Sequence, residues 1–485
     1  MNNDAFYLGA DPNNPRRLFW LDIRERRAHM AIVGGSGAGK SNLLLDLFGQ
    51  DVMAGRGCCL IDPKGDLFHD ILAAMTAIPE EKWPSLAQDL VVIDPSDPRS
   101  PVAFNPLEVS PYGSASRQRQ DMVSVFRKIW RLDDAQTPRL GLVLRRSIHL
   151  AMESGLTLCD LQHILTDNAF RFGLVQRSRD DSLRTFWEHE FPESAAAQMQ
   201  WAASTLTRLE SLLDDPAIRR FLGQPRSSFD FREIKDQSKV SQINLAKGAL
   251  GEETAHLLGG FLLGRLQLAA ESRQDIWPEE ARRPFYLYVD EFQNYATSSF
   301  EELLAESRGL GLSLVMANQH LAQLDPGLQH AILSNARIRV AFRVNYEDAT
   351  ILAREFFRFA GDRVKDKELE WVKLGRGVAI PVGYKYDYYS ASDEGRQNRE
   401  ALHYLPDRLL WVHLQGEPSP YRLRSVDMPR AQLAASRDRV ARLKELINQV
   451  QRVPALDAPA PVAAPSPGRT YEWAGRHQGS EVGRS

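Results

Sequence analysis

The sequence predicts an α/β protein in which a doubly wound, mostly parallel sheet is interrupted by an inserted all-helical domain. Three observations carry this prediction. Short apolar runs alternate with helical patterns between about residues 28 and 94, as they do in parallel sheets. From about residue 113 to 222, apolar residues recur at helical spacing without a credible strand. Strand signals then resume at residue 239.

The first part of the sheet domain, residues 1–112, contains three expected strands. Each is a short apolar run, and their bounds are 28–33, 58–62 and 90–94. A glycine-rich turn and a helix over 42–52 follow the first strand, and a helix over about 66–77 follows the second. This strand–helix–strand spacing is typical of a parallel sheet.

The inserted helical domain is predicted over 113–230, and the sheet domain continues over 231–429. Four further apolar runs are expected to be strands: 239–246, 285–290, 312–318 and 338–344. The chain has 485 residues, which is enough for this discontinuous domain and its insert. The sheet is therefore assembled from both sides of the helical insert.

An amphipathic C-terminal helix is predicted over residues 430–453. Its apolar residues fall at mostly heptad-like positions: Leu433, Val440, Leu443, Ile447 and Val450. Such a helix either packs on its own domain or pairs with a partner as a coiled coil, and the pattern allows both. Residues 454–485 are rich in proline and alanine, which predicts a disordered tail.

The composition is that of a soluble globular protein. Hydrophobic residues make up 43%, charged residues make up 25%, and the formal net charge is −3. The three cysteines, Cys58, Cys59 and Cys159, show no metal or disulfide spacing. No signal peptide is visible, and the apolar stretch 256–270 is interrupted by Arg265. A cytoplasmic protein without direct membrane insertion is expected, which would reach a membrane channel only through partners.

The segment GGSGAGKS at 34–41 has the spacing of a phosphate-binding loop, between an expected strand and an expected helix. Its glycines let several backbone N–H groups point at one anion, and the helix N-terminus adds partial positive charge. ATP and Mg²⁺ are the expected cofactors, with Lys40 reaching the β/γ-phosphates and Ser41 ligating Mg²⁺. The residues expected to bind ATP are Gly34, Gly35, Ser36, Gly37, Ala38, Gly39, Lys40, Ser41 and Asn42.

Two adjacent carboxylates end the expected strand FYLYVD at 285–290. A phosphate-loop hydrolase needs an acid that holds Mg²⁺ through its water shell and a second group that orients the attacking water. Asp290 is assigned to the metal and Glu291 to the water. Asp62 and Asp94 also end strands and compete for this role, but neither is followed directly by a second acid.

Five motifs in order resemble the DNA-pumping ATPases of the FtsK/HerA superfamily, and more narrowly the TraG/TraD type of conjugative and type IV secretion coupling protein. They are GGSGAGKS, IDPKGD (61–66), FNPL (104–107), VDEFQNYAT (289–297) and ANQHLAQLD (317–325). The resemblance covers roughly residues 20 to 425. It implies a RecA-like phosphate-loop domain and a hexameric ring around DNA, with ATP held between neighbouring subunits.

The resemblance also implies two further catalytic residues. Gln319 matches the polar residue that senses the γ-phosphate, although a glutamine at a strand end could instead cap the following helix. Arg308 matches the position of an arginine finger inserted by a neighbouring subunit, and its alternative is a solvated arginine at a helix end. In relatives, Asp62 and Lys64 lie near the nucleotide or the subunit interface.

The expected function is therefore an ATPase that translocates DNA. Many coupling proteins begin with transmembrane helices and HerA relatives with a small β-barrel, whereas this phosphate loop lies only about 30 residues from the start. This departure favours a cytosolic motor whose partners are relaxase or secretion components, or a nuclease. The alternatives are a HerA-like ATPase that acts with a nuclease in DNA processing or defence, and a nucleotide-gated assembly scaffold.

Two segments could contact DNA from a local patch. The first is the cationic run NARIRVAFR with Arg337, Arg339 and Arg343, and the second is YKYDYYS over 384–390. The first could instead be the solvated face of a strand, and the second a half-buried hairpin. The sequence leaves these alternatives open.

Overall fold

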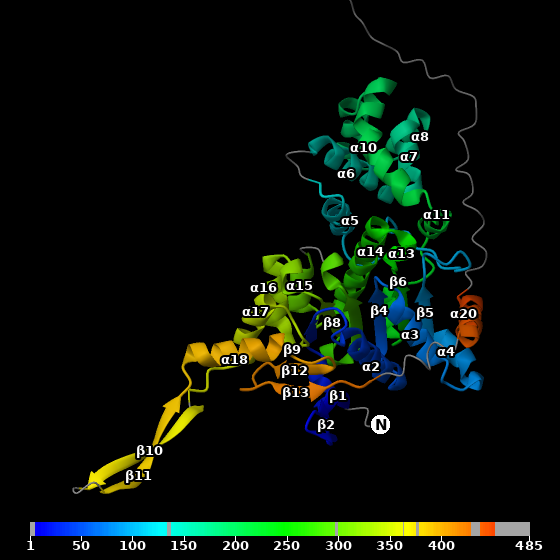
Figure 1. Ribbon diagram of the computed structural model, residues 1–485. Helices are drawn as coiled ribbons and strands as arrows, with labels where there is room; N and C mark the ends of the chain where they lie inside the picture. The colour runs from blue at the N-terminus through cyan, green and yellow to red at the C-terminus, as the bar shows by residue number, and fades with distance from the viewer. Residues whose placement is uncertain are drawn as a thin grey trace, which may run out of the picture.

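An eleven-stranded sheet lies at the centre of the computed structural model (Figure 1). The structure describes residues 5–132, 137–295, 299–361, 363–374, 378–427 and 437–451. The strand order is β2 (Asn14–Asp22), β1 (Ala5–Asp11), β13 (Tyr421–Arg424), β12 (Leu409–Leu414), β9 (Ala336–Ala341), β3 (His29–Val33), β8 (Leu312–Asn318), β7 (Phe285–Asp290), β4 (Gly57–Asp62), β6 (Val240–Asn244) and β5 (Leu90–Ile93).

The strands from β9 to β5 in this order pair in parallel and form the doubly wound core. They are the strands predicted from apolar runs, so the predicted fold class is confirmed. In β3, β4 and β7 every residue is buried. Such continuous apolar runs are expected where helices cover both faces of a parallel sheet.

Two sets of helices bury the two faces. One face packs against α2 (Lys40–Met53), α3 (Asp66–Met75), α4 (Trp83–Asp89) and α20 (Arg437–Val450). The other packs against α13 (Lys247–Leu250), α14 (Glu252–Glu271), α15 (Ser299–Glu306), α16 (Pro326–Asn335) and α17 (Tyr346–Phe356). This three-layer arrangement brings the loops after the parallel strands to one edge of the sheet.

Four antiparallel strands, β12, β13, β1 and β2, extend the sheet beyond β9. The sequence did not predict them. Most side chains of β2 are exposed, so the strand carries no alternation of apolar and polar residues. Its pairing depends on contacts with β1, and β1 in turn depends on β13 at the far end of the sequence.

The helical insert leaves the sheet after β5 and returns at β6. Its helices are α5 (Ala115–Ile129), α6 (Pro138–Glu153), α7 (Leu161–Thr166), α8 (Asn168–Val175), α9 (Asp181–Thr185), α10 (Ala195–Leu213), α11 (Pro216–Leu222) and α12 (Phe231–Asp236). It stands beyond the carboxyl ends of the strands, at the top of Figure 1. Within the described ranges, no helix is both long and apolar enough to cross a membrane.

The C-terminal helix α20 packs on its own domain. Leu443 and Ile447 are fully buried, and Lys444 Nζ lies 3.1 Å from Asp94 and 3.2 Å from Asp97. Of the two alternatives, the described part of the helix therefore follows the intramolecular one. Leu433 and the tail 454–485 lie outside the described residues.

A long two-stranded hairpin projects from the body (Figure 1, yellow). It consists of β10 (Val364–Leu374) and β11 (Val378–Tyr388) and connects α17 to α18 (Ala391–His403). The run YKYDYYS begins in β11. It is therefore part of a hairpin, but one whose tyrosines are exposed rather than half-buried in the domain.

A buried ion pair fixes the phosphate-loop helix α2 against the sheet. Arg26 ends the short helix α1 (Ile23–Arg26) and donates to both oxygens of Asp51 on α2, at 2.7 and 2.8 Å. Tyr288 on β7 donates to the same carboxylate at 2.5 Å. Because β7 carries Asp290 at its end, this cluster links the two elements that form the candidate active site.

Arg26→Met is expected to lower the stability of the fold by about 3–5 kcal/mol, because it breaks a fully buried ion pair. Arg24→Met is the matched control on the same helix, since the Arg24–Asp22 pair is solvent-exposed. The urea midpoint should fall for Arg26→Met and stay almost unchanged for Arg24→Met. Equal midpoints for the two variants would contradict the structural role of this pair.

Candidate active site

The phosphate loop connects β3 to α2, as the sequence predicted. Gly37 and Gly39 adopt positive φ angles of 75° and 128°, which side-chain-bearing residues rarely adopt. Gly34 packs so closely on the residue that follows β9 that an added Cβ would lie 2.6 Å from Cβ of Phe342. These glycines therefore give the loop its curvature and its close contact with the sheet.

Two backbone hydrogen bonds join the phosphate loop to neighbouring segments of the chain. Gly35 N–H donates to Arg343 O at 2.8 Å, and Arg408 N–H donates to Ala38 O at 3.1 Å. Ser36 and Gly37 are exposed at the outer side of the loop. The first-turn N–H groups of α2 have no partner within the helix, so the loop can present them to an anion.

Lys40 lies at the centre of the site. Its ammonium donates to Gly34 O at 2.5 Å and to Gly35 O at 3.2 Å. Burial lowers the pKa of Lys40, whereas the nearby carboxylates of Asp290 and Glu291 raise it. The ammonium therefore stands between the phosphate loop and the two acids.

The residues after Lys40 differ in what their side chains can do. Ser41 is half-buried in the first turn of α2. Asn42 is buried and its amide donates to Val426 O, on the segment that follows β13. A contribution of Asn42 to nucleotide binding would therefore come from its backbone.

Asp290, the last residue of β7, and Glu291, which follows it, lie in different environments. Asp290 is buried, and burial raises its pKa to about 6, with Glu291 and Asp62 adding to the rise while Lys64 and Lys40 oppose it. Glu291 adopts a left-handed backbone conformation, with φ 49° and ψ 49°. This turn carries the second carboxylate away from the strand and toward the neighbouring loops.

Three side chains hold the Glu291 carboxylate. Lys64 Nζ donates to Oε1 at 2.6 Å, Gln319 Nε2 donates to Oε1 at 2.5 Å, and Gln293 Nε2 donates to Oε2 at 2.8 Å. Burial raises the pKa of Glu291, but these hydrogen bonds outweigh it and the pKa is lowered. The carboxylate stays ionised and fixed, as a water-orienting group requires.

The strand order explains why these residues meet. Gln319 follows β8, Glu291 follows β7 and Lys64 follows β4, and these three strands are adjacent in the sheet. The structure thus brings together Lys40, Asp290, Glu291 and Gln319, all predicted site residues. Sequence reasoning missed Gln293 and the contact of Lys64 with Glu291, although the position of Lys64 just after a strand was a usable signal.

The competing strand-end acids have other partners. Asp62 accepts hydrogen bonds from Lys64 N and Phe68 N, both at 2.9 Å, and so caps the turn into α3. Asp94 accepts from Asn244 Nδ2 at 3.1 Å and pairs with Lys444. The geometry therefore favours Asp290 and Glu291 as the acids of the site.

The oxygen atoms of Ser41 and Asp290 suit the coordination that Mg²⁺ prefers. No group of three or more His, Cys, Asp or Glu side chains that could cage an ion occurs among the residues that the structure describes. Mg²⁺ commonly keeps several waters and uses only one or two carboxylates. The Ser41 hydroxyl and the Asp290 carboxylate would hold it in that way.

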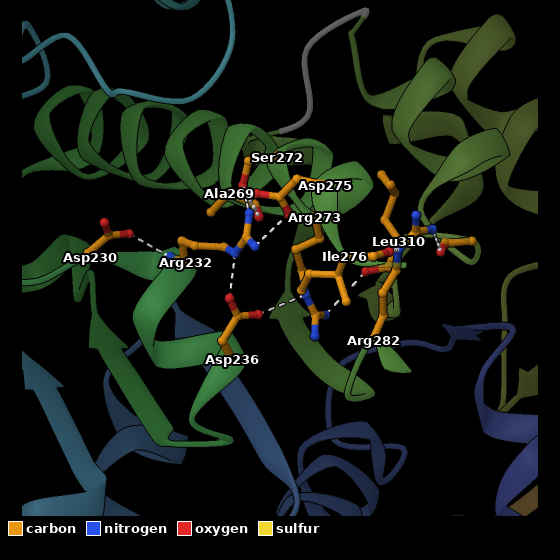
Figure 2. A network of polar contacts seen from close by, with 11 residues as sticks. Asp230, Arg232, Asp236, Ala269, Ser272, Arg273, Asp275, Ile276, Arg282 and Leu310 are labelled. Atoms are coloured by element: carbon orange, nitrogen blue, oxygen red, sulfur yellow. Dashed lines mark hydrogen bonds and ion pairs between the residues drawn. The ribbon is translucent and has the colours of Figure 1, made fainter. Parts of the chain in front are cut away.

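Arg308 lies far from the phosphate loop of its own chain. It is exposed just before β8 begins, at the amino edge of the sheet, whereas the loop lies at the carboxyl edge. Its segment is anchored there, because Arg282 donates to Gly309 O at 2.5 Å and Arg273 to Leu310 O at 3.2 Å (Figure 2). Arg308 cannot complete the site of its own subunit.

The same network ties this segment to the end of the helical insert. Arg232 of α12 donates to Asp275 at 2.7 Å and pairs with Asp236 at 2.5 Å, and Asp236 pairs with Arg273 at 3.0 Å (Figure 2). The buried Arg273 therefore connects the insert, the end of α14 and the segment that carries Arg308.

His29 packs beside the same segment and is held in its neutral form. Its Nε2 lies 3.0 Å from Leu304 O, and its Nδ1 accepts from Leu314 N at 3.0 Å. Both ring nitrogens are thus used, and a proton on Nδ1 would face another N–H group. Burial lowers the pKa of His29 from 6.5 to about 4.

Acid is expected to destabilise the fold through His29. The unfolded chain takes up this proton near pH 6.5 and the folded protein only near pH 4, so stability falls as the pH falls through this window. The loss between pH 7 and pH 5 is about 2 kcal/mol. Urea unfolding of the wild-type chain at pH 7 and pH 5 should show this loss of stability, and the loss should be smaller in His29→Gln. An equal loss in the variant would contradict this assignment.

The three arginines in and after β9 lie in different environments. β9 lies between β12 and β3, and all of its residues except the half-buried Arg337 are buried. Arg339 is buried and pairs with Glu355 at 3.0 Å, and Arg337 pairs with Glu25 at 2.6 Å. Arg343 follows the strand, is exposed, and pairs with Asp407 at 3.0 Å. The solvated-face alternative therefore fails for Arg339, whereas DNA contact by Arg337 or Arg343 stays a prediction.

Comparisons with known proteins agree with this geometry. Residues 284–360, which span β7 to α17, match the family model described as the TraM recognition site of TraD and TraG. The type 4 coupling protein DotL of Legionella pneumophila is 21% identical over 414 residues, which are 73% of this chain and 52% of that protein. The chain thus spans about half the length of this curated relative.

Solved structures share the fold. The bacterial conjugative coupling protein TrwBdeltaN70 aligns over 84% of this chain and 86% of its own, at 17% identity and a TM-score of 0.53. VirB4 of Thermoanaerobacter pseudethanolicus aligns over 89% of this chain and 99% of its own, at 12% identity and a TM-score of 0.55. The chain has the fold of RecA-like phosphate-loop ATPases and is similar, in sequence and in fold, to the TraG/TraD type of coupling protein.

Proposed function

We propose that this chain is an ATP-hydrolysing ring motor of the coupling-protein type, which binds and moves DNA. The observation that carries the proposal is the cluster at the carboxyl edge of the sheet, where Lys40, Asp290, Glu291 and Gln319 converge beside the phosphate loop. The conjugative coupling protein TrwB, a structural neighbour, has been solved in complex with ADP and Mg²⁺.

The residues of this cluster have separate roles in the proposal. The loop from Gly34 to Asn42 holds the phosphates with its N–H groups, and Lys40 neutralises charge that develops during transfer. Ser41 and Asp290 would hold Mg²⁺, which would supply positive charge to neutralise the phosphates. Glu291 orients the attacking water, and Gln319 connects Glu291 with the end of β8.

The position of Arg308 supports a ring. Because Arg308 lies at the opposite edge of the sheet from its own phosphate loop, it can act only on the nucleotide of another subunit. A hexamer in which neighbours share active sites would place it there, with DNA in the central channel. Relaxase or secretion components are the proposed protein partners, and the match to a TraM recognition site supports a partner surface within 284–360.

The ATPase rate with and without long DNA tests the proposal. Wild type should hydrolyse ATP slowly alone and faster with DNA, and Glu291→Gln should abolish both rates. ATP binding and ring formation without DNA stimulation would instead favour the nucleotide-gated scaffold. Stimulation that requires a co-purified nuclease would favour a HerA-like role in DNA processing or defence.

A further inference from the structure

The β10–β11 hairpin exposes an unusual amount of apolar surface. An isolated two-stranded ribbon is only marginally stable in water, yet this one extends away from the body with both faces uncovered (Figure 1). Eight large apolar side chains on it are between 41% and 55% exposed: Val364, Leu369, Trp371, Val372, Ile380, Tyr384, Tyr386 and Tyr388. A surface of this kind marks an interaction site.

The pairing register sorts the aromatic residues onto one face. Residues directly opposite each other in an antiparallel pair point to the same side. Tyr384 pairs with Leu369 and Tyr386 with Lys367. Tyr388 and Trp371 lie two residues further along their own strands and point the same way. We call this set the tyrosine face: Lys367, Leu369, Trp371, Tyr384, Tyr386 and Tyr388.

The acidic residues lie on the opposite face. Asp366 pairs with Asp387, and Glu368 pairs with Lys385. Glu370 alternates with Leu369 and belongs to the same side as Glu368. The charged residue of the tyrosine face is Lys367. The hairpin thus separates its carboxylates from its aromatic rings.

The rings form a regular ladder. The centroids of Tyr384 and Tyr386 are 6.4 Å apart, and those of Tyr386 and Tyr388 are 6.5 Å apart. Lys367 Nζ lies 3.6 Å from the Tyr384 ring centroid. The ring spacing is close to twice the ~3.4 Å between stacked bases of one strand. A strand whose bases are spread apart can therefore lay one base on each ring.

We propose that the tyrosine face binds single-stranded DNA by stacking unpaired bases on Tyr384, Tyr386 and Tyr388, with Lys367 on the phosphates. Base–aromatic stacking with nearby cations is the usual way in which proteins hold single strands without reading their sequence. The absence of carboxylates from this set suits a polyanion. The inference rests on the proposed function in one respect, namely that DNA is what the motor moves.

Fluorescence anisotropy with the full chain tests this inference without ATP. The probes are a labelled oligodeoxythymidine strand and the same strand annealed to its complement. Tyr386→Ala should weaken binding of the single strand about 5- to 100-fold, and Tyr386→Phe should keep it, because the phenyl ring still stacks. Tyr404→Ala is the control, since Tyr404 is 73% exposed but lies outside the hairpin.

A matched pair of lysines tests which face is used. Lys367→Ala should weaken binding of the single strand more than Lys385→Ala, although each removes one positive charge from the same hairpin. Unchanged affinity in Tyr386→Ala would overturn the inference. An equal loss for the duplex probe would also overturn it, because paired bases cannot lie on the rings.

A protein partner is the other outcome that would overturn the inference. If Tyr386→Ala retains binding of the single strand but changes the mass of the protein in light scattering, the tyrosine face contacts another subunit. Because binding is measured without hydrolysis, failure of this inference is distinguishable from failure of the proposed motor. A chain that lacks ATPase activity but binds the strand through Tyr386 would refute only the motor.

Discussion

Glu291→Gln is expected to stop ATP hydrolysis and to leave ATP binding intact. The amide oxygen can still accept from Lys64 and Gln319, which both donate to Oε1, at 2.6 and 2.5 Å. The Gln293 amide, which donates to Oε2 at 2.8 Å, can turn over and accept from the new NH₂ group, so the site should keep its shape. A glutamine lacks the negative charge that polarises the attacking water, and loss of such a group typically costs 10²–10⁴ in rate. Single-turnover hydrolysis and binding of a fluorescent ATP analogue measure the two properties separately.

Asp94→Asn is the matched control for this change. Asp94 also ends a parallel strand, but it pairs with Lys444 of α20 at 3.1 Å instead of facing the phosphate loop. Hydrolysis should therefore be retained in Asp94→Asn. Wild-type hydrolysis by Glu291→Gln would show that another group orients the water, and Asp62 would be the next acid to test.

Arg308→Ala is expected to lower turnover by about 10³–10⁵ while ATP still binds. The reason is geometric: Arg308 lies at the amino edge of the sheet and can stabilise the transferred phosphoryl group only in a neighbouring subunit. Arg283→Ala is the matched control, since Arg283 is another exposed arginine at that edge, directly before Pro284 and β7. Steady-state ATPase rates at saturating ATP compare the two variants.

Mixing variants tests whether the sites are shared. A ring that contains Arg308→Ala and Glu291→Gln subunits includes some sites with an intact Glu291 from one subunit and an intact Arg308 from the next. Activity should therefore reappear on mixing two inactive proteins. No recovery at any ratio would contradict shared sites, and normal hydrolysis by Arg308→Ala would remove the assignment altogether.

Much of the fold could be predicted because its core strands are buried on both sides. Runs such as FYLYVD and LSLVMAN are continuous in apolar residues, and a single sequence is enough to find them. The antiparallel extension was missed because β2 is mostly exposed and its pairing depends on partners far away in the chain.

The alternation of arginines in β9 was misleading for a related reason. Arg337 and Arg339 resemble the solvated face of a strand, but Glu25 and Glu355 pair with the two guanidinium groups, and Arg339 is buried. These partners come from α1 and α17, so a pattern within one strand could not reveal them. Long-range pairing decided the burial of this strand.

In the candidate site, the residues that belong to a local sequence pattern could be predicted, whereas contacts that depend on the folded arrangement could not. The phosphate loop and the two acids have local patterns, and both were predicted. The contact of Lys64 with Glu291 was missed because it depends on the adjacency of β4 and β7, which the sequence does not contain. The contact of Gln293 with Glu291 spans only two residues, but it depends on the conformation of the turn after β7. The role of Arg308 stays a prediction, since it depends on a second subunit.

Displacement of streptavidin from biotinylated DNA shows whether this chain moves along DNA. A motor that moves along DNA should remove streptavidin from the end of a single strand, a duplex, or both, only when ATP is hydrolysed. We predict displacement by the wild-type chain with ATP, and none by Glu291→Gln or with a non-hydrolysable analogue. ATP hydrolysis by the wild-type chain without displacement from either DNA would show that the chain is not a DNA translocase.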